Sequence, residues 1–191
     1  MKRLAALLSL ALAGFTGPGP QRATWPETAR HLMEGPAMGV LRALAQRDFL
    51  RLASFVGPDG LKLSPYVMLD DGDVRLSRSE VARCGRSRRA RLWGSKDGSG
   101  EDIRMTCGRY FANYVWDADY RKADEVLTDK RQRGLEPNNN HGYVPGAVVV
   151  EFHLREKAQP FRPWSSLRLV FRPSAQGPLR LIAITRDVRT I

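Results

Sequence analysis

The stretch LRALAQRDFLRLASFVGPDGLKLS, residues 41–64, decides the fold class, because its pattern changes from helical to extended within a few residues. Up to residue 56 the apolar side chains recur at spacings near three and four, which indicates one face of an amphipathic helix. These side chains are Leu41, Leu44, Ala45, Leu52, Phe55 and Val56. The turn residues GPDG at 57–60 then end the helix, and a β-prone run follows. The stretch therefore predicts a helix, a turn and a strand in that order.

Other helices are predicted from breaking and capping residues. The Gly-Pro pair at 35–36 divides the helical pattern of residues 28–56 into a short first helix and a longer second one. Ser79 is the expected N-cap of a short helix, and Thr106 is the expected N-cap of an aromatic-rich helix over residues 107–116. We therefore expect most of the helices to precede the main strands.

The C-terminal third has the pattern of three consecutive strands separated by turns. They cover residues 146–154, 165–173 and 178–188. In the middle strand Leu167 and Leu169 alternate with Arg168, which predicts one buried face and one solvent-exposed face. Residues 127–146 are polar and are expected to form a long loop. Helices followed by antiparallel strands indicate an α+β domain, with the helices packed on one face of the sheet.

The N-terminus has the layout of a secretory signal peptide. Lys2 and Arg3 precede an apolar run of about twelve residues, and Ala11-Leu12-Ala13, with small residues at its first and third positions, provides a cleavage site. The run is shorter than the roughly 20 apolar residues that span a bilayer, although an uncleaved anchor remains an alternative. We interpret residues 1–23 as signal peptide and flexible leader, and residues 24–191 as a single domain. The protein is expected to be secreted or periplasmic, and not integral to the membrane after cleavage.

The chain is basic, with a formal net charge of +11, and 25 of its 31 basic residues are arginine. Five arginines fall within RCGRSRRAR, residues 83–91. Nucleic acid is not an expected partner, because the cluster has no interleaved aromatic residues for base stacking and the protein is expected to be exported. Two interpretations of the cluster stay open: a solvated loop, or a contact with anionic envelope lipid or polysaccharide.

The two cysteines, Cys84 and Cys107, match no metal-binding spacing. In an oxidising compartment an even cysteine count permits one disulfide, and the sequence leaves open whether the two residues pair. The histidines His31, His141 and His153 lie far apart in sequence and form no HxxxH or HxH pair. No metal site and no cofactor are therefore expected.

The glycine-rich stretch LWGSKDGSGEDIRMT, residues 92–106, is open to three interpretations: a phosphate loop, a calcium loop or a turn. It lacks the GKS or GKT of a phosphate loop and the full acidic set of an EF-hand. Asp97-Gly98 is a strong hairpin signal, and the segments 91–93 and 102–106 can pair as strands. We interpret the stretch as a structural turn.

The stretch 41–64 also resembles the opening helix and first strand of the nuclear transport factor two-like superfamily, which includes the SnoaL-like proteins. The resemblance rests on the spacing of five residues in the helix: Ala45, Asp48, Phe49, Leu52 and Ala53. Later segments resemble exported bacterial proteins, so that the resemblance covers roughly residues 38–191. It implies a curved sheet wrapped around helices into a cone with an open mouth. Such cones host isomerases, dehydratases, hydrolases and binding proteins, so the fold leaves the function open.

Four residues are candidates for a ligand pocket. Trp93 and Tyr114 are the expected apolar walls, although Tyr114 can equally be a core aromatic. Glu151 and His153 are the polar candidates, because they share one face of a predicted strand, and that face can line the cone or meet solvent. The resulting hypothesis is an exported small binding or accessory protein that takes a small ligand or an envelope component. The alternative is a small hydrolase or isomerase with an acid–base pair inside the cone.

Overall fold

The computed structural model describes residues 35–128, 133, 138–174 and 177–188. The predicted signal peptide and the predicted first helix lie outside these residues. Among the residues described, no helix is both long and apolar enough to cross a bilayer.

A six-stranded sheet forms the larger part of the fold, with the strand order β2-β1-β8-β7-β6-β5. Its strands are β1 (Leu61–Leu63), β2 (Val74–Leu76), β5 (Glu125–Thr128), β6 (Val148–Leu154), β7 (Ser165–Ser174) and β8 (Gly177–Val188). All neighbouring strands are antiparallel except β1 and β8, which are parallel. A separate two-stranded sheet pairs β3 (Ala90–Ser95) with β4 (Asp102–Thr106). The three predicted C-terminal strands are therefore confirmed as β6, β7 and β8.

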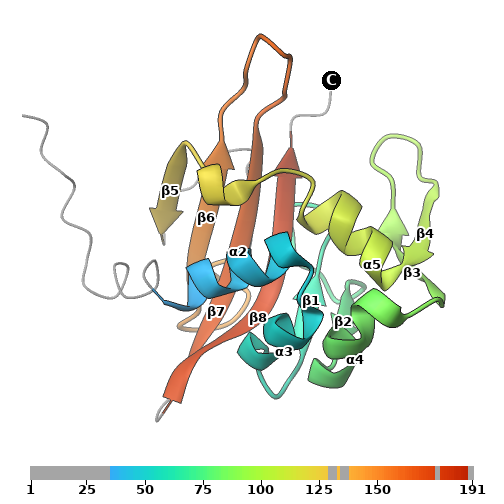
Figure 1. The fold of residues 1–191 in the computed structure, drawn as a ribbon, viewed down its shortest axis with the longest axis vertical. Coiled ribbons are helices and arrows are strands. Elements are labelled where there is room, and N and C mark those ends of the chain that lie inside the picture. The colour runs from blue at the N-terminus through green and yellow to red at the C-terminus, as the bar shows by residue number, and fades with distance from the viewer. Residues whose placement is uncertain (1–34, 129–132, 134–137, 175–176, 189–191) are drawn as a thin grey trace, which may run out of the picture.

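The helices lie on one face of the six-stranded sheet. They are α2 (Pro36–Gln46), α3 (Phe49–Phe55), α4 (Arg78–Arg83) and α5 (Cys107–Tyr110). Two short 3-10 helices, η1 (Cys84–Arg86) and η3 (Tyr120–Lys122), and the π-helix η2 (Phe111–Val115) accompany them. Figure 1 shows α2 crossing in front of β6, β7 and β8, with α3, α4 and α5 beside it. The fold is the predicted α+β arrangement, in which N-terminal helices pack on a curved, mostly antiparallel sheet.

Two helix boundaries differ from the predictions, and side-chain caps explain both. The long helix predicted up to Val56 is two helices, because Arg47 adopts a left-handed conformation with φ 53° and Asp48 caps α3 by accepting the Arg51 N–H at 2.9 Å. The N-cap of α4 is Ser77 rather than Ser79. Glu80 stands three residues after Ser77, which completes a capping box that Ser79 cannot form.

Both faces of the sheet are buried, which corrects the prediction of one solvent-exposed face. The helix-covered face is apolar and includes Phe152, Leu167 and Leu169. The opposite face carries Arg168, which is fully buried although it was expected to meet solvent. Segment 138–147 covers part of this face, and its half-buried apolar side chains pack against Val149, Val170, Ile182 and Ala183. We call the two surfaces the helix face and the loop face of the sheet.

Candidate functional site

The glycine-rich stretch is a β-hairpin, as predicted. β3 and β4 pair antiparallel from Ala90 opposite Thr106 to Ser95 opposite Asp102. The Lys96 N–H donates to the Glu101 carbonyl at 2.7 Å, and the intervening glycines at 98 and 100 have positive φ values of 76° and 69°. Only glycine adopts such angles without strain, so the glycines here serve the turn.

Trp93 and Tyr114, the two predicted pocket walls, belong to one aromatic stack. Tyr110 lies between them, with ring centroids 4.0 Å from Trp93 and 5.3 Å from Tyr114, and both pairs are nearly parallel at 13°. The Trp93 Nε1–H donates to the Met105 carbonyl at 2.9 Å, which fixes the indole against β4. The stack separates two pockets, because Trp93 lines one of them and Tyr114 lines the other.

The pocket beside Tyr114 lies where the end of β8 meets η2, the β3–β4 hairpin and the segment after β1. Its cavity volume is about 410 Å³. Its walls combine apolar or aromatic residues with four charged ones: Pro65, Tyr66, Val67, Tyr114 and Val188, and Lys96, Asp97, Arg186 and Asp187. We call it the β8-end pocket. Its size falls in the range of roughly 300–1,000 Å³ that is typical of small-molecule sites. Five of its nine lining residues are apolar or aromatic.

Arg186 is the most buried cation of the β8-end pocket, with a side chain only 14% exposed. It forms an ion pair with Asp117, which also accepts the Tyr120 hydroxyl at 3.0 Å. These neighbours raise the pKa of Arg186 although burial opposes the rise. The Tyr66 hydroxyl donates to the Ser95 carbonyl at 2.7 Å, and so holds the hairpin against this pocket. The pocket therefore combines aromatic walls with one fixed guanidinium.

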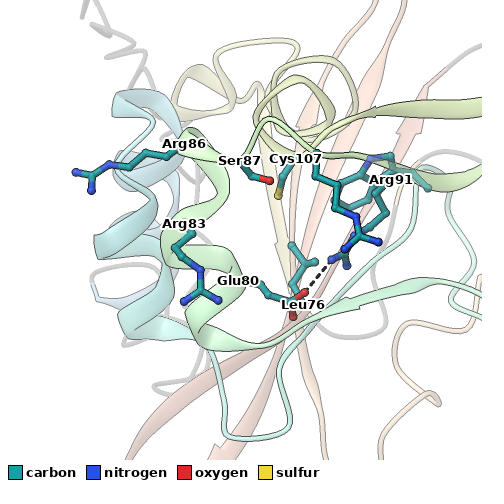
Figure 2. Close-up of a pocket in the computed structure, with 9 residues that line it drawn as sticks. Leu76, Glu80, Arg83, Arg86, Ser87, Arg91 and Cys107 are labelled. Carbon is teal, nitrogen blue, oxygen red and sulfur yellow. Dashed lines mark hydrogen bonds and ion pairs between the residues drawn. The ribbon is translucent and has the colours of Figure 1, made fainter.

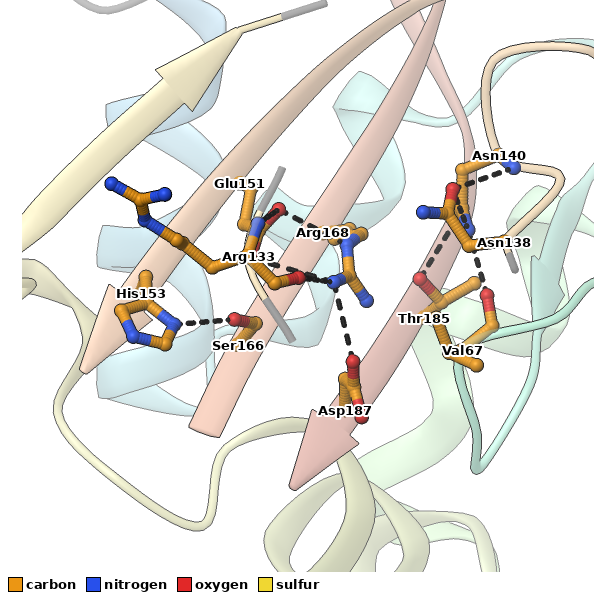
Figure 3. A network of polar contacts seen from close by, with 10 residues as sticks. All are labelled: Val67, Arg133, Asn138, Asn140, Glu151, His153, Ser166, Arg168, Thr185 and Asp187. Atoms are coloured by element: carbon orange, nitrogen blue, oxygen red, sulfur yellow. Dashed lines mark hydrogen bonds and ion pairs between the residues drawn. The ribbon is translucent and has the colours of Figure 1, made fainter. Parts of the chain in front are cut away.

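Glu151 and His153 lie on the loop face, away from both aromatic walls. Glu151 is fully buried and receives the Arg168 guanidinium, Nε to Oε2 at 3.2 Å, and the Arg133 N–H at 3.1 Å. Arg168 also reaches Asp187 at 3.3 Å, so that one cation joins two carboxylates (Figure 3). We call this group the buried ion network. Because the Glu151 carboxylate is already bound by Arg168 and by the Arg133 N–H, we interpret Glu151 as a structural residue.

His153 is also buried, with 8% of its surface exposed. Its Nδ1 lies 2.8 Å from the Ser166 hydroxyl, and its ring is 6.0 Å from that of Trp164. Burial lowers the pKa of His153, which favours the neutral imidazole. Neither His153 nor Glu151 lines either of the two pockets beside the aromatic stack. The structure therefore does not bring the four predicted pocket residues together.

The pocket beside Trp93 lies between α4, η1 and β3 (Figure 2). Its cavity volume is about 360 Å³. Cys107 contributes to its wall, and a disulfide joins Cys107 to Cys84 with the Cα atoms 5.1 Å apart. The basic cluster of the sequence surrounds the cavity through Arg83, Arg86, Arg89 and Arg91. We call it the arginine pocket.

Sequence patterns missed the polar residues of the β8-end pocket. Arg186 lies on a predicted strand, but nothing in that strand indicated that Asp117 would meet it from the segment after η2. Tyr66 follows Pro65 in a stretch that was read as an interrupted strand. Within the described ranges, no three His, Cys, Asp or Glu side chains lie close enough together to hold a metal ion.

Comparisons with known proteins give distant structural similarities. No protein-family model matches the chain, and no curated protein is detectably similar to it in sequence. The chain aligns with the yeast UBP3-associated protein BRE5 at 9% identity and a TM-score of 0.40, over 85% of this chain and 98% of that one. ActVI-ORFA from Streptomyces coelicolor aligns at 12% identity and a TM-score of 0.39, over 84% and 96% of the two chains. A variant of Rd1NTF2_05 aligns at 12% identity and 0.37, over 84% and 96%. No ligand and no activity follow from similarities at this level.

Proposed function

We propose that the protein is a small binding module that holds a largely apolar organic molecule in the β8-end pocket. The observation that carries this proposal is the position of Tyr114 beside Arg186 in a cavity of about 410 Å³. An aromatic wall offers a flat apolar contact, and one buried guanidinium offers donors to a carbonyl or carboxylate group of the ligand. A few polar groups in an apolar pocket typically set the orientation of a ligand.

The alternative of a hydrolase or isomerase has less support. Its acid–base pair was expected in Glu151 and His153, and both lie on the loop face. Two carboxylates line the β8-end pocket, Asp97 and Asp187, and a third, Asp117, binds Arg186 beside it. Asp187 is already bound to Arg168, Asp117 also accepts the Tyr120 hydroxyl, and Asp97 is exposed at the hairpin turn. A binding role therefore needs fewer changes to these contacts than an acid–base role.

We also propose that the protein acts outside the cytoplasm. The basic and apolar pattern of residues 2–13 supports this proposal, and a disulfide between Cys84 and Cys107 agrees with an oxidising compartment. A C-terminally tagged chain should be recovered from the periplasm or the medium with an N-terminus near Gly14. Recovery of the intact leader in a soluble cytoplasmic fraction would refute export and would leave the pocket proposal standing.

Titration with the neutral flat dye Nile red, followed by its fluorescence, tests the binding proposal. Replacing Tyr114→Ala should weaken dye binding about fivefold, since an aromatic contact contributes on the order of 1 kcal/mol. The matched control is Tyr143→Ala, which removes a half-buried tyrosine from the loop face and should leave the dye affinity unchanged. Equal weakening in both variants, or no saturable binding to the unaltered protein, would exclude the β8-end pocket as the site.

A further inference from the structure

A second site is indicated by the charge of the arginine pocket. Its wall carries four arginines and one carboxylate, that of Glu80. Glu80 is bound to Arg91, Nη2 to Oε1 at 2.8 Å. Among the described residues, no carboxylate lies within ion-pair distance of Arg83, Arg86 or Arg89. The pocket therefore has an excess of positive charge.

The side chains of the arginine pocket are not equally placed (Figure 2). The Arg86 guanidinium points away from the cavity, whereas Arg91 lies on the side of Glu80 and Leu76. The Arg91 guanidinium also lies 5.9 Å from the Trp93 ring centroid, which favours a planar stacked position. Glu80 and Trp93 thus both hold Arg91, and its guanidinium is already oriented in the absence of a ligand.

The floor of the arginine pocket is apolar and well buried. It includes Leu76 and Trp93, which are 2% and 1% exposed, and Cys107 of the disulfide. A cavity of about 360 Å³ is several times larger than one phosphate or carboxylate group. The space beyond the arginines therefore suits a small apolar group that is attached to an anion.

We propose that the arginine pocket binds a phosphate monoester. The phosphate lies on Arg91 and on the lining arginines Arg83 and Arg89, and the organic part of the ligand lies on the floor near Trp93. Guanidinium groups bind phosphate oxygens through parallel N–H donors, and several cations match a dianion better than a monoanion. The source of the monoester can be a small soluble molecule or the head group of a lipid such as phosphatidic acid. The site lies on the Trp93 side of the aromatic stack, away from the β8-end pocket.

Isothermal titration with phenyl phosphate tests this site directly. Arg91→Gln should weaken binding about tenfold or more, because hydrogen bonds to charged groups are among the stronger ones. Arg104→Gln is the matched control: Arg104 also lies on the small sheet and also pairs with an acid, Asp102 at 3.0 Å, but it is not part of the pocket wall. The control should change the affinity by about twofold at most at physiological salt.

A second variant separates a specific site from diffuse charge. Glu80→Gln should strengthen phenyl phosphate binding about threefold, because it frees Arg91 from an exposed ion pair. Glutamine preserves the capping box of α4, so the helix is retained. The affinity should also rise between pH 5 and pH 7.5, as the phosphate loses its second proton with a pKa of about 6. Glu80, whose pKa the Arg91 contact lowers to about 2, stays ionised over that interval.

The source of the monoester is resolved by a parallel arm with vesicles of phosphatidylcholine, with and without phosphatidic acid. Binding of phenyl phosphate alone identifies a soluble ligand, and Arg91-dependent binding to the phosphatidic acid vesicles identifies a lipid head group. Both results support the proposal. Equal losses in Arg91→Gln and Arg104→Gln, tighter binding of benzoate than of phenyl phosphate, or no binding in either arm would overturn it.

Discussion

Leu167 and Arg168 are neighbours on β7, both are fully buried, and they lie on opposite faces of the sheet. Leu167 packs among apolar side chains under the helices. Arg168 binds the carboxylates of Glu151 and Asp187 and the Arg133 carbonyl, and among the described residues only its Nη1 finds no hydrogen-bond partner. The helix face is therefore buried by apolar contact, whereas the centre of the loop face is buried around an ion network whose cation is held by two carboxylates and one carbonyl.

The segment that covers the loop face is attached by asparagine side chains. Asn140 donates to the Val67 carbonyl at 2.7 Å and accepts the Thr185 hydroxyl at 2.8 Å. Asn139 binds both the N–H and the carbonyl of Leu69, at 2.8 and 2.6 Å. These amides replace strand partners that the backbone after β1 lacks. The comparison teaches that a sheet face carrying an arginine can be interior where neighbouring strands supply carboxylates for it and a loop covers the rest of the face.

The largest expected effect comes from the centre of the buried ion network. Arg168→Met should lower the free energy of unfolding by about 3–5 kcal/mol, because it leaves the carboxylates of Glu151 and Asp187 buried without their cation. Urea denaturation followed by circular dichroism measures the change. If the loss stayed below about 1 kcal/mol, as is usual for exposed ion pairs, the loop face would be a solvated surface.

Arg172 provides the matched control on the same strand. Its side chain is 43% exposed and pairs with Asp59, which is 57% exposed. Arg172→Met should therefore cost about 0–1 kcal/mol. The ratio of the two losses measures how much the cover over the loop face, rather than the arginine itself, contributes to stability.

The disulfide gives the next effect, and it belongs to the helix face. Cys84 and Cys107 both lie in the apolar cluster under the helices and connect the end of α4 to the start of α5. Replacing both by alanine should lower the free energy of unfolding by about 3 kcal/mol, since the bond closes a loop of 23 residues. A reducing agent should lower the melting temperature of the unaltered protein and leave that of the double variant unchanged. Two freely titratable thiols in the native protein would exclude the bond.

The elements predicted with most success were those with local signals. The alternation of residues 146–188 located β6, β7 and β8, and Asp97-Gly98 located the hairpin. The break at Arg47 was missed because the apolar stripe continues through it, and the Asp48 cap was outweighed by that periodicity. Strand β5 was missed because Glu125–Thr128 borders a polar segment, and its pairing with β6 is a long-range contact.

The site was less predictable, because it depends on contacts between distant segments. Periodicity correctly placed Glu151 and His153 on one face, but it carries no information about what covers that face. The ion pair of Arg186 with Asp117 joins residues 69 positions apart, and no local pattern indicates it. Trp93 was predicted to share a pocket with Tyr114, and the structure places the two rings on opposite sides of Tyr110, with Trp93 on the wall of the arginine pocket.

His153 provides the smallest and most discriminating effect. As a pocket residue it was expected to affect ligand binding and to leave stability unchanged. As a buried residue bound to Ser166 it should behave in the opposite way. His153→Ala should lower the free energy of unfolding by about 1–2 kcal/mol and should leave Nile red binding unchanged. Weaker dye binding with an unchanged free energy of unfolding would show instead that His153 belongs to the ligand site.

The pH dependence of stability tests the same placement without removing a large side chain. Burial lowers the pKa of folded His153 below the value of about 6.5 expected in the unfolded chain. Between these two values the unfolded chain binds more protons, so stability rises with pH there. The contribution of the neutral imidazole is complete above about pH 6.5 and is lost as the pH falls through the folded pKa. Subtracting the unfolding free energies of His153→Gln from those of the unaltered protein between pH 5 and 7.5 isolates this slope. A flat difference would mean that His153 meets solvent, and the loop face would then be open at that edge.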